Sequence, residues 1–339
     1  MSTESTTSEH PLVPLAPPAA PPAPGRRWSP LTLIGIVVSI VALAGVVWWA
    51  SKQQAPDLPS TPKEIAALIG AIVLYGLATV VRAERWQRLL DDEGATPHRA
   101  DTYSLTVVGY MGNNVLPARA GDAIRVVLMA PRANTSNRTV VGTLVAERIL
   151  DVVVLLVLFV VVGYGLLGEV GGSSVELIVI VAIVGISFAA VLWRFIRKNE
   201  RLHGALAPIA SATLGLRKAH HGLRLLGMTL VIWAIEAAVW MSVGAAVGFG
   251  MDPIEGLYLV ALASVFSMIP SGPGYAGTQD AAVAIGIKAI GGTGGIKVGY
   301  LLMLRFVIVV PITLLGLILM ITRYGGLKKL RSVRAEAKG

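Results

Sequence analysis

Long apolar stretches without a charged side chain constrain this chain more than any other feature of its sequence. A transmembrane helix needs about 20 consecutive apolar residues. The charge-free apolar stretches that we interpret as parts of spans are residues 31–50, 65–81, 152–167, 177–193, 237–249 and 306–322. Only 14% of the 339 residues are charged, whereas soluble domains carry about 25%. We therefore expect an all-α, polytopic membrane protein.

The Lys and Arg residues fall unevenly between these stretches and predict an orientation. The basic groups are Arg26 and Arg27, then Arg82, Arg85 and Arg88 after the second stretch, residues 194–224, and residues 323–338. Residues 168–176 and 250–256 carry acidic side chains and no basic one. Cytoplasmic loops hold the excess of Lys and Arg. The pattern predicts about six crossings of the cell inner (plasma) membrane, with both termini in the cytoplasm.

Composition divides the chain into three parts. Residues 1–27 are rich in Pro and Ala and should form a disordered cytoplasmic tail. Residues 28–325 should form the transmembrane domain, and residues 326–339 a basic cytoplasmic tail. The absence of cysteine excludes disulfides and Cys-ligated metals. The net charge of +9 fits anionic lipid beside the spans, so we expect no nucleic-acid partner.

Two further apolar stretches, residues 102–116 and 256–269, are too short to cross comfortably. Each ends in a segment that contains Pro and Gly, residues 117–121 and 270–277, and a second short helix follows. We interpret both as re-entrant helical hairpins, the first entering from inside and the second from outside. Non-helical backbone at membrane depth is tolerated only beside protein or a wet cavity. The alternative is a pair of ordinary kinked hairpins that cross fully.

The two halves of the transmembrane domain resemble each other weakly. A Pro-to-Asp motif at residues 117–122 has a counterpart at residues 273–280, and a Gly-x5-Arg pattern follows each: Gly142 to Arg148, and Gly299 to Arg305. An odd number of predicted crossings separates equivalent points, so the repeats, about 64–167 and 225–322, should be inverted. Inverted repeats with broken helices are typical of secondary transporters.

Ionisable side chains lie deep within predicted spans. Arg148 and Arg305 should each lie roughly 14 Å from the start of their helix, Glu147 and Asp151 flank Arg148, and Glu236 lies mid-span. Such groups must face protein or water. Since guanidinium binds phosphate bidentately, we predict that Arg148 and Arg305 share a substrate phosphate, with an acid, Glu236 or Glu147, separating them in the empty site. The alternative is structural ion pairs that tie the helices together.

The hairpin motifs contribute further candidates for substrate binding. Arg119 and Arg125 lie in the first motif, where the alternative reading is surface charge on the cytoplasmic side. Asp122 and Asp280 open the second short helices, where an acid also stabilises a helix N-terminus. Helix N-termini after the breaks would add donors for an anion. No phosphate-binding loop, HExxH or G-x-S-x-G motif occurs, so we expect no cofactor and no metal.

Three segments resemble the lysylphosphatidylglycerol synthase transmembrane region, a flippase-like family: VLPARAGDAIRVVLM, GTLVAERILDVVVLLVL and SMIPSGPGYAGTQDAAV. The resemblance covers roughly residues 60–325 and implies a lipid flippase fold with inverted re-entrant helices. The positions that match the family's motifs are Arg119, Asp122, Arg125, Glu147, Arg148, Asp151, Gly274, Gly277 and Asp280. Family members often carry Glu at the two Asp positions and Gly-Gly where Gly274 and Tyr275 stand, which leaves the head-group preference open. The short basic tail predicts a stand-alone membrane part, without the aminoacyltransferase domain of longer members.

Together these features predict a transporter that moves an anionic phospholipid or a lipid-linked head group between leaflets. The candidate binding residues are the family positions together with Tyr275, Glu236 and Arg305. An intramembrane enzyme acting on lipid phosphates and a membrane scaffold remain alternatives. Besides substrate and membrane lipids, the candidate partners are a second copy of the chain and a separate lipid-modifying enzyme.

Overall fold

The computed structural model describes Trp48 and residues 56–116, 120–167, 219–267, 277–292 and 294–325, which form helices and, within these ranges, no strand. The helices are α2 (Pro62–Asp92), α3 (Arg99–Val115), α4 (Ala120–Arg132), α5 (Asn137–Leu167), α8 (Ala219–Ala246), α9 (Pro253–Ser267), α10 (Thr278–Ala289) and α11 (Gly295–Tyr324). The all-α prediction is confirmed for this part of the chain.

Three of these helices are long and apolar enough to cross a membrane: α2, α8 from His220, and α11. Helix α5 is also 31 residues long, and its residues 152–167, which follow Glu147, Arg148 and Asp151, carry no charged side chain. The predicted spans at residues 31–50 and 177–193 lie outside the described residues, apart from Trp48. A membrane protein is therefore supported, while the count of six crossings stays a prediction.

The ends of the long helices follow from local sequence. Helix α2 begins with a capping box, in which the Thr61 side chain accepts a hydrogen bond from the Glu64 backbone N–H, and the Glu64 carboxylate accepts one from the Thr61 backbone. Pro62 occupies the first turn, where no backbone N–H is needed. Helix α11 ends at Gly325, which adopts φ = 70°, a left-handed conformation that glycine tolerates best.

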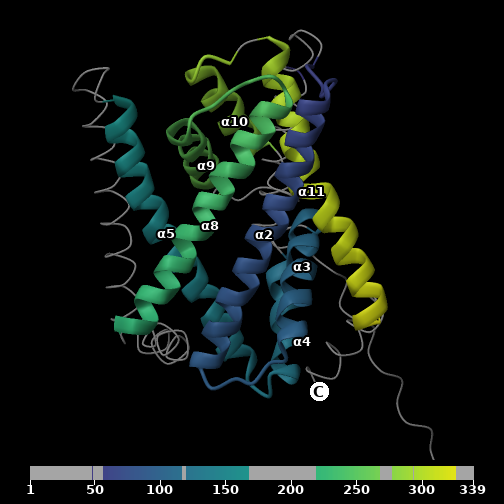
Figure 1. Ribbon diagram of the computed structural model, residues 1–339. Helices are drawn as coiled ribbons and strands as arrows, with labels where there is room; N and C mark the ends of the chain where they lie inside the picture. The colour runs from purple at the N-terminus through teal and green to yellow at the C-terminus, as the bar shows by residue number, and fades with distance from the viewer. Residues whose placement is uncertain are drawn as a thin grey trace, which may run out of the picture.

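The short helices form two pairs at opposite ends of the bundle. Helices α3 and α4 lie in the lower half of Figure 1 and α9 and α10 in the upper half, while α2 and α8 pack against each other through the middle. The longest of the four, α3, has 17 residues and spans about 25 Å, less than the ~30 Å hydrocarbon core. The interpretation as re-entrant hairpins stays a prediction.

Two glycines set the geometry of the pairs. A Cβ on Gly121 would lie 1.9 Å from the carbonyl oxygen of Gly109 and 2.6 Å from the backbone nitrogen of Asn113, so α4 can approach α3 this closely only with glycine there. Gly277 precedes α10 with φ = 90°, a conformation that other residues rarely adopt. Gly121 directly precedes Asp122, and Gly277 lies three residues before Asp280. The two glycines therefore help to fix the positions of the motif aspartates.

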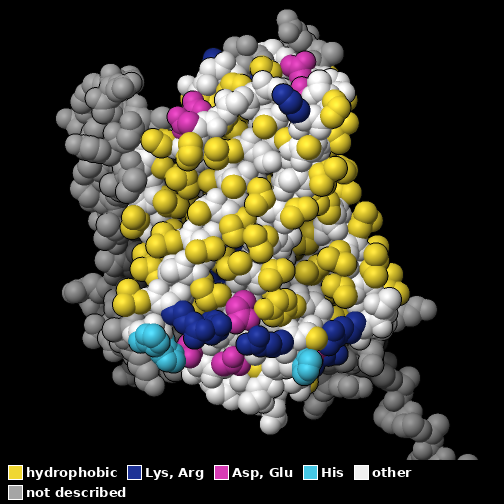
Figure 2. All heavy atoms as spheres, in the orientation of Figure 1, with side chains coloured by type: hydrophobic (Ala, Val, Ile, Leu, Met, Phe, Trp, Pro, Cys, Tyr) yellow, Lys and Arg dark blue, Asp and Glu magenta, His cyan; other side chains and the backbone are white. Residues whose placement is uncertain are grey.

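The surface of the bundle is apolar over its middle. Side chains such as Leu77, Leu230 and Ile318 are about half exposed there, and Figure 2 shows apolar side chains across the face in view. Lys, Arg and His side chains gather along the lower edge of that face. This distribution is typical of a protein in contact with lipid, with water at its two ends.

Candidate functional site

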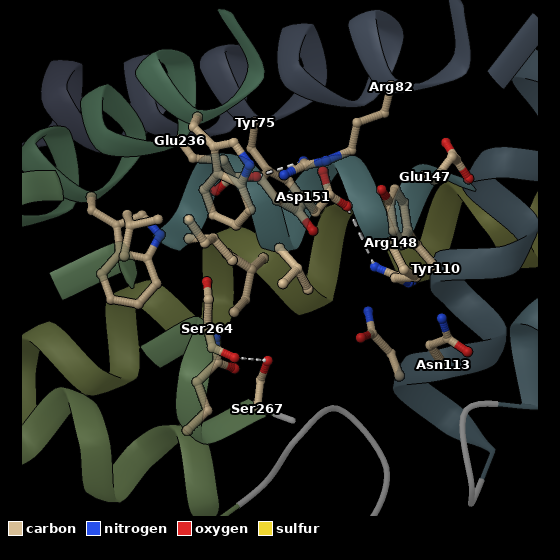
Figure 3. A pocket seen from close by; sticks show the side chains of 18 of the residues that line it. Tyr75, Arg82, Tyr110, Asn113, Glu147, Arg148, Asp151, Glu236, Ser264 and Ser267 are labelled. Carbon is tan, nitrogen blue, oxygen red and sulfur yellow. Dashed lines mark hydrogen bonds and ion pairs between the residues drawn. The ribbon is translucent and has the colours of Figure 1, made fainter. Parts of the chain in front are cut away.

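A cavity of about 420 Å³ opens where the two hairpins meet, and all eight described helices line it (Figure 3). Its charged lining residues are Arg82, Arg85, Arg125, Arg148, Glu147, Asp151 and Glu236. Its uncharged polar and aromatic lining includes Tyr75, Tyr110, Asn113, Asn114, Trp233, Trp240, Ser264, Ser267 and Gln279. Four arginines in one intramembrane cavity are unusual, because each must be paired or solvated there.

Arg82 and Glu236 join α2 to α8 on one side of the cavity. The Arg82 Nη1 atom lies 2.5 Å from Glu236 Oε1. The two side chains are 15% and 9% exposed, so water screens the pair little. Such a pair holds the two central helices in register as long as both partners are present.

Arg85 is the most buried of the four arginines, with 2% of its surface exposed. Its Nη1 donates hydrogen bonds to Asp151 at 2.7 Å and to the Thr229 hydroxyl at 2.8 Å, and its Nη2 lies 3.8 Å from Glu147. Three helices, α2, α5 and α8, therefore meet at one guanidinium.

Arg125, on α4, is 4% exposed. It donates a 3.0 Å hydrogen bond to Glu147 and lies 3.8 Å from Asp122. Its guanidinium also sits 3.9 Å above the ring of Trp86, whose indole N–H donates to the Thr143 hydroxyl. This combination of ion pair and cation–π contact fixes Arg125 firmly.

Arg148 differs from the other three arginines. Its guanidinium lies 3.5 Å from Asp122 and 3.9 Å from Asp151, and 49% of its side chain is exposed. These separations exceed the 2.7–2.9 Å of a good charge-assisted hydrogen bond. Among the cavity arginines, Arg148 is thus the most accessible.

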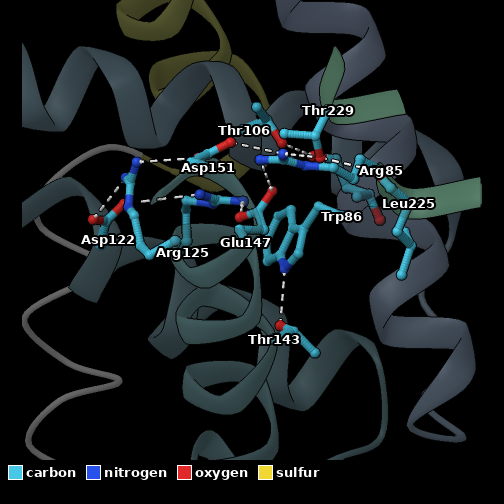
Figure 4. Close-up of polar contacts among 12 residues, drawn as sticks. Arg85, Trp86, Thr106, Asp122, Arg125, Thr143, Glu147, Asp151, Leu225 and Thr229 are labelled. Atoms are coloured by element: carbon cyan, nitrogen blue, oxygen red, sulfur yellow. Dashed lines mark hydrogen bonds and ion pairs between the residues drawn. The ribbon is translucent and has the colours of Figure 1, made fainter. Parts of the chain in front are cut away.

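These contacts close into a ring of alternating charge, visible in Figure 4. We call it the ion-pair ring; in order its members are Arg85, Glu147, Arg125, Asp122, Arg148 and Asp151. Helices α2, α4 and α5 supply it. Because every member has an oppositely charged neighbour on each side, the ring can hold six charges at membrane depth.

The second half of the chain repeats one of these contacts away from the cavity lining. Asp280 accepts a 2.6 Å hydrogen bond from Arg305 Nε and a 2.9 Å bond from the Gly277 backbone N–H. Neither Asp280 nor Arg305 lines the cavity. The sharing of a phosphate by Arg148 and Arg305 stays a prediction; of the two arginines, Arg148 lines the cavity and Arg305 does not.

The structure brings together six of the twelve predicted site residues. Glu147, Arg148, Asp151, Arg125 and Glu236 line the cavity, with Asp122 directly behind Arg148. The surface-charge alternative for Arg125 is wrong, because its side chain is 5% exposed. The predicted residues Arg119, Gly274 and Tyr275 lie outside the described residues.

Sequence reasoning missed Arg82 and Arg85, which it assigned to the cytoplasmic end of a span. The structure continues α2 to Asp92 and places both arginines at the cavity. The signal was their spacing: Arg82 and Arg85 lie three residues apart, which puts them on one helix face. That face could not be assigned to the interior without knowing where the acids of α5 and α8 would lie.

Two curated relatives resemble most of this chain at low identity. Glycosyltransferase AglD of Haloferax volcanii is 22% identical over an alignment of 321 residues that covers 78% of this chain and 51% of AglD. UPF0104 membrane protein PH1989 of Pyrococcus horikoshii is 22% identical over 299 residues, covering 76% of this chain and 87% of PH1989. The chain thus spans about half the length of AglD. No solved structure matches it.

The family itself is clear from a match along most of the sequence. The model of the lysylphosphatidylglycerol synthase TM region matches residues 33–316, a range that contains every charged residue of the cavity. With its helices, its apolar surface and its intramembrane charge cluster, this chain belongs to the lysylphosphatidylglycerol synthase TM region family.

Proposed function

We propose that this protein moves an anionic phospholipid, or another lipid-linked phosphate head group, between the two leaflets of the cell membrane. The observation that carries the proposal is the half-exposed guanidinium of Arg148, which lies 3.5 Å from Asp122 in a cavity that all eight described helices line. A phosphate could displace the long contacts of Arg148 with Asp122 and Asp151 and form shorter ones. The guanidinium fork matches phosphate bidentately.

The remaining arginines support an anion at the same place. Arg85 and Arg125 are fixed by carboxylates and stay charged, because guanidinium does not lose its proton in proteins. The Nε atoms of both are buried without a hydrogen-bond partner among the described residues, so each guanidinium keeps one N–H donor that no described residue uses. The uncharged lining offers amide, hydroxyl and indole groups to the rest of a head group.

The arrangement of the short helices supports movement across the bilayer. Two hairpins at opposite ends of the bundle, related by the sequence repeat, are what an inverted-repeat transporter needs for access from both sides. In this proposal the hairpins are re-entrant, and the cavity between them receives the head group while the acyl chains stay in lipid. The gathering of basic groups along the lower edge suggests that this edge is cytoplasmic.

The name of one relative extends the candidate substrates. AglD is named a glycosyltransferase, so a sugar carried on a lipid phosphate belongs among the head groups to be tested. Such a lipid shares the phosphate on which the proposal depends. The transport assay below therefore uses both a phospholipid and a glycosylated lipid phosphate.

The test measures lipid movement in proteoliposomes that contain fluorescent phosphatidylglycerol or a fluorescent polyprenyl-phosphate sugar. Wild-type protein should transfer at least one of them between leaflets. Arg148→Ala should reduce the rate at least tenfold, and Arg148→Lys should reduce it less, since charge remains but the fork is lost. Arg138→Ala is the matched control, because Arg138 lies exposed in the first turns of the same helix, away from the cavity lining.

Two results would count against the proposal. One is folded wild-type protein that moves neither lipid. The other is a folded Arg148→Ala protein that moves lipid at the wild-type rate, which is also what a membrane scaffold would give. An intramembrane enzyme would instead change the lipid chemically, which thin-layer chromatography of the recovered lipid detects.

A further inference from the structure

Among the described residues, the charged side chains of the ion-pair ring and of two neighbouring pairs balance one another. The ion-pair ring contains three arginines and three carboxylates. Two neighbouring ion pairs are Arg82 with Glu236 and Arg305 with Asp280. Each of these pairs contributes one positive and one negative charge. The empty ring and its neighbouring pairs are therefore neutral as a set.

An anionic head group disturbs that balance. Arg85, Arg125 and Glu147 are at most 6% exposed, so on this buried side of the ring water compensates an extra charge poorly. A singly charged phosphate on Arg148 leaves three cations facing four anions. One positive charge must enter with the phosphate, and a proton on one of the carboxylates is the smallest change that supplies it.

When Arg148 turns to a phosphate, Asp122 is the carboxylate of the ring that loses the most compensation of its negative charge. Glu147 keeps its 3.0 Å hydrogen bond from α4, and Asp151 keeps its 2.7 Å hydrogen bond from α2. Among the described residues Asp122 keeps longer contacts, 3.8 Å to Arg125 on its own helix and 3.4 Å to an amide on α3. Its ionised form is thus the least compensated in the occupied site.

The surroundings of Asp122 allow a proton to reach it. Its side chain is 30% exposed, more than that of either other carboxylate in the ring. The polar and charged groups that face it are Asn113 from α3, Arg125 from α4 and Arg148 from α5, with Glu147 and Asp151 beyond the two arginines. Asp122 does not itself line the cavity but lies behind Arg148, and water at its partly exposed side chain can deliver a proton without crossing the buried part of the ring.

We propose that the protein takes up one proton, on Asp122, with each singly charged head group that it binds, and that lipid movement is thereby coupled to a proton gradient. This inference rests on the proposed function. The proton comes from water on the side to which the cavity is open and binds a carboxylate oxygen of Asp122. On the other side the phosphate leaves, Arg148 returns to Asp122, and the proton goes back to water. One negative and one positive charge cross together, so the cycle moves no net charge.

The first experiment measures protons released or taken up on binding. Purified full-length protein in weakly buffered detergent solution, with a pH-sensitive dye, is titrated with short-chain dioctanoyl phosphatidylglycerol, and a protein-free titration is subtracted. Wild type should take up about one proton per lipid bound. Its Kd should rise about tenfold per pH unit where Asp122 is ionised in the empty site.

Asp122→Asn places a neutral amide where the protonated carboxyl would stand. The lipid that this variant binds should bring no proton, and its Kd should not depend on pH. Asp57→Asn is the matched control, because Asp57 is exposed and lies outside the cavity lining; its proton uptake should equal that of wild type. If Asp122→Asn prevents folding, two wild-type measurements still test the inference: the number of protons taken up per lipid bound, and the change of Kd with pH.

The second experiment separates the two components of a proton gradient in proteoliposomes. Wild-type lipid movement should accelerate severalfold down an imposed pH difference and should not respond to a potassium–valinomycin potential. Lipid binding without proton uptake overturns the proton-coupling inference and leaves the proposed function standing. That result would mean that the substrate brings its own positive charge. Acceleration of lipid movement by the potential also overturns the proton-coupling inference. Absence of both binding and movement rejects the proposed function, and this inference with it.

Discussion

Asp280 accepts a 2.6 Å hydrogen bond from Arg305, 25 positions later in the chain. Asp122 and Arg148 make the corresponding contact in the first half, at 3.5 Å and at a similar separation in sequence. Each aspartate lies in the first turns of the second short helix, and each arginine lies in the long helix that follows. The two halves thus carry the same pair, but of these four residues Arg148 is the one that lines the cavity.

The two pairs should respond differently to substitution. Arg305→Gln leaves the 6% exposed Asp280 without its cation and should lower the free energy of unfolding by about 3 kcal/mol. Arg148→Gln removes a half-exposed partner, so stability should change by less than about 1 kcal/mol while lipid binding weakens. Thermal unfolding in detergent and dioctanoyl phosphatidylglycerol titration measure the two effects. The opposite pattern, with binding lost in Arg305→Gln and stability lost in Arg148→Gln, would contradict this assignment.

The pair of Arg82 and Glu236 should be a structural tie between α2 and α8. Glu236→Gln leaves the positive charge of Arg82 without compensation and should destabilise by about 3 kcal/mol. The double variant Arg82→Met with Glu236→Leu should recover much of that loss, since apolar residues can replace a buried ion pair. A double-mutant cycle from thermal unfolding gives the coupling. If the double variant loses as much free energy of unfolding as the two single variants together, Arg82 and Glu236 do not stabilise the protein as a pair.

Gly121 should tolerate no side chain. Gly121→Ala forces α4 away from α3, because its Cβ would overlap the Gly109 carbonyl. The shift displaces Asp122 and Arg125 together, so both stability and lipid movement should fall. Gly76→Ala is the control, since a Cβ there meets nothing within 4 Å and alanine favours the helix by about 0.5–1 kcal/mol. Wild-type transport in Gly121→Ala would show that the close approach of α4 is not needed.

The predicted orientation can be read with single cysteines, because the chain contains none. Lys288 lies at the upper end of the bundle and Arg99 at the lower end, and both side chains are exposed. In intact cells, a membrane-impermeant maleimide should label Lys288→Cys and not Arg99→Cys. After permeabilisation both should react. Labelling of Arg99→Cys alone in intact cells reverses the proposed orientation.

Local sequence was sufficient for much of the fold. Apolar runs of membrane length predicted the long helices, and Pro and Gly predicted the breaks after α3 and before α10, because these effects act within a few residues. The Gly-Asp and Gly-x5-Arg patterns likewise predicted a repeated motif. The residues of α5 named from the motif, Glu147, Arg148 and Asp151, do line the cavity.

Only the tertiary structure decided which charges meet. Arg85 is separated by 66 positions from Asp151 and by 144 from Thr229, so no local pattern marks it as their partner. Along the chain, it is one of several arginines near the end of a span. Packing of α2 against α5 and α8 turns that same residue into the most buried cation of the ion-pair ring. The sequence by itself predicted ionisable side chains deep within helices of membrane-spanning length, because residue identity and helix position are local properties of the chain. Which charges pair, and that Arg148 alone among the cavity arginines stays half exposed, depends on how helices distant in sequence pack together.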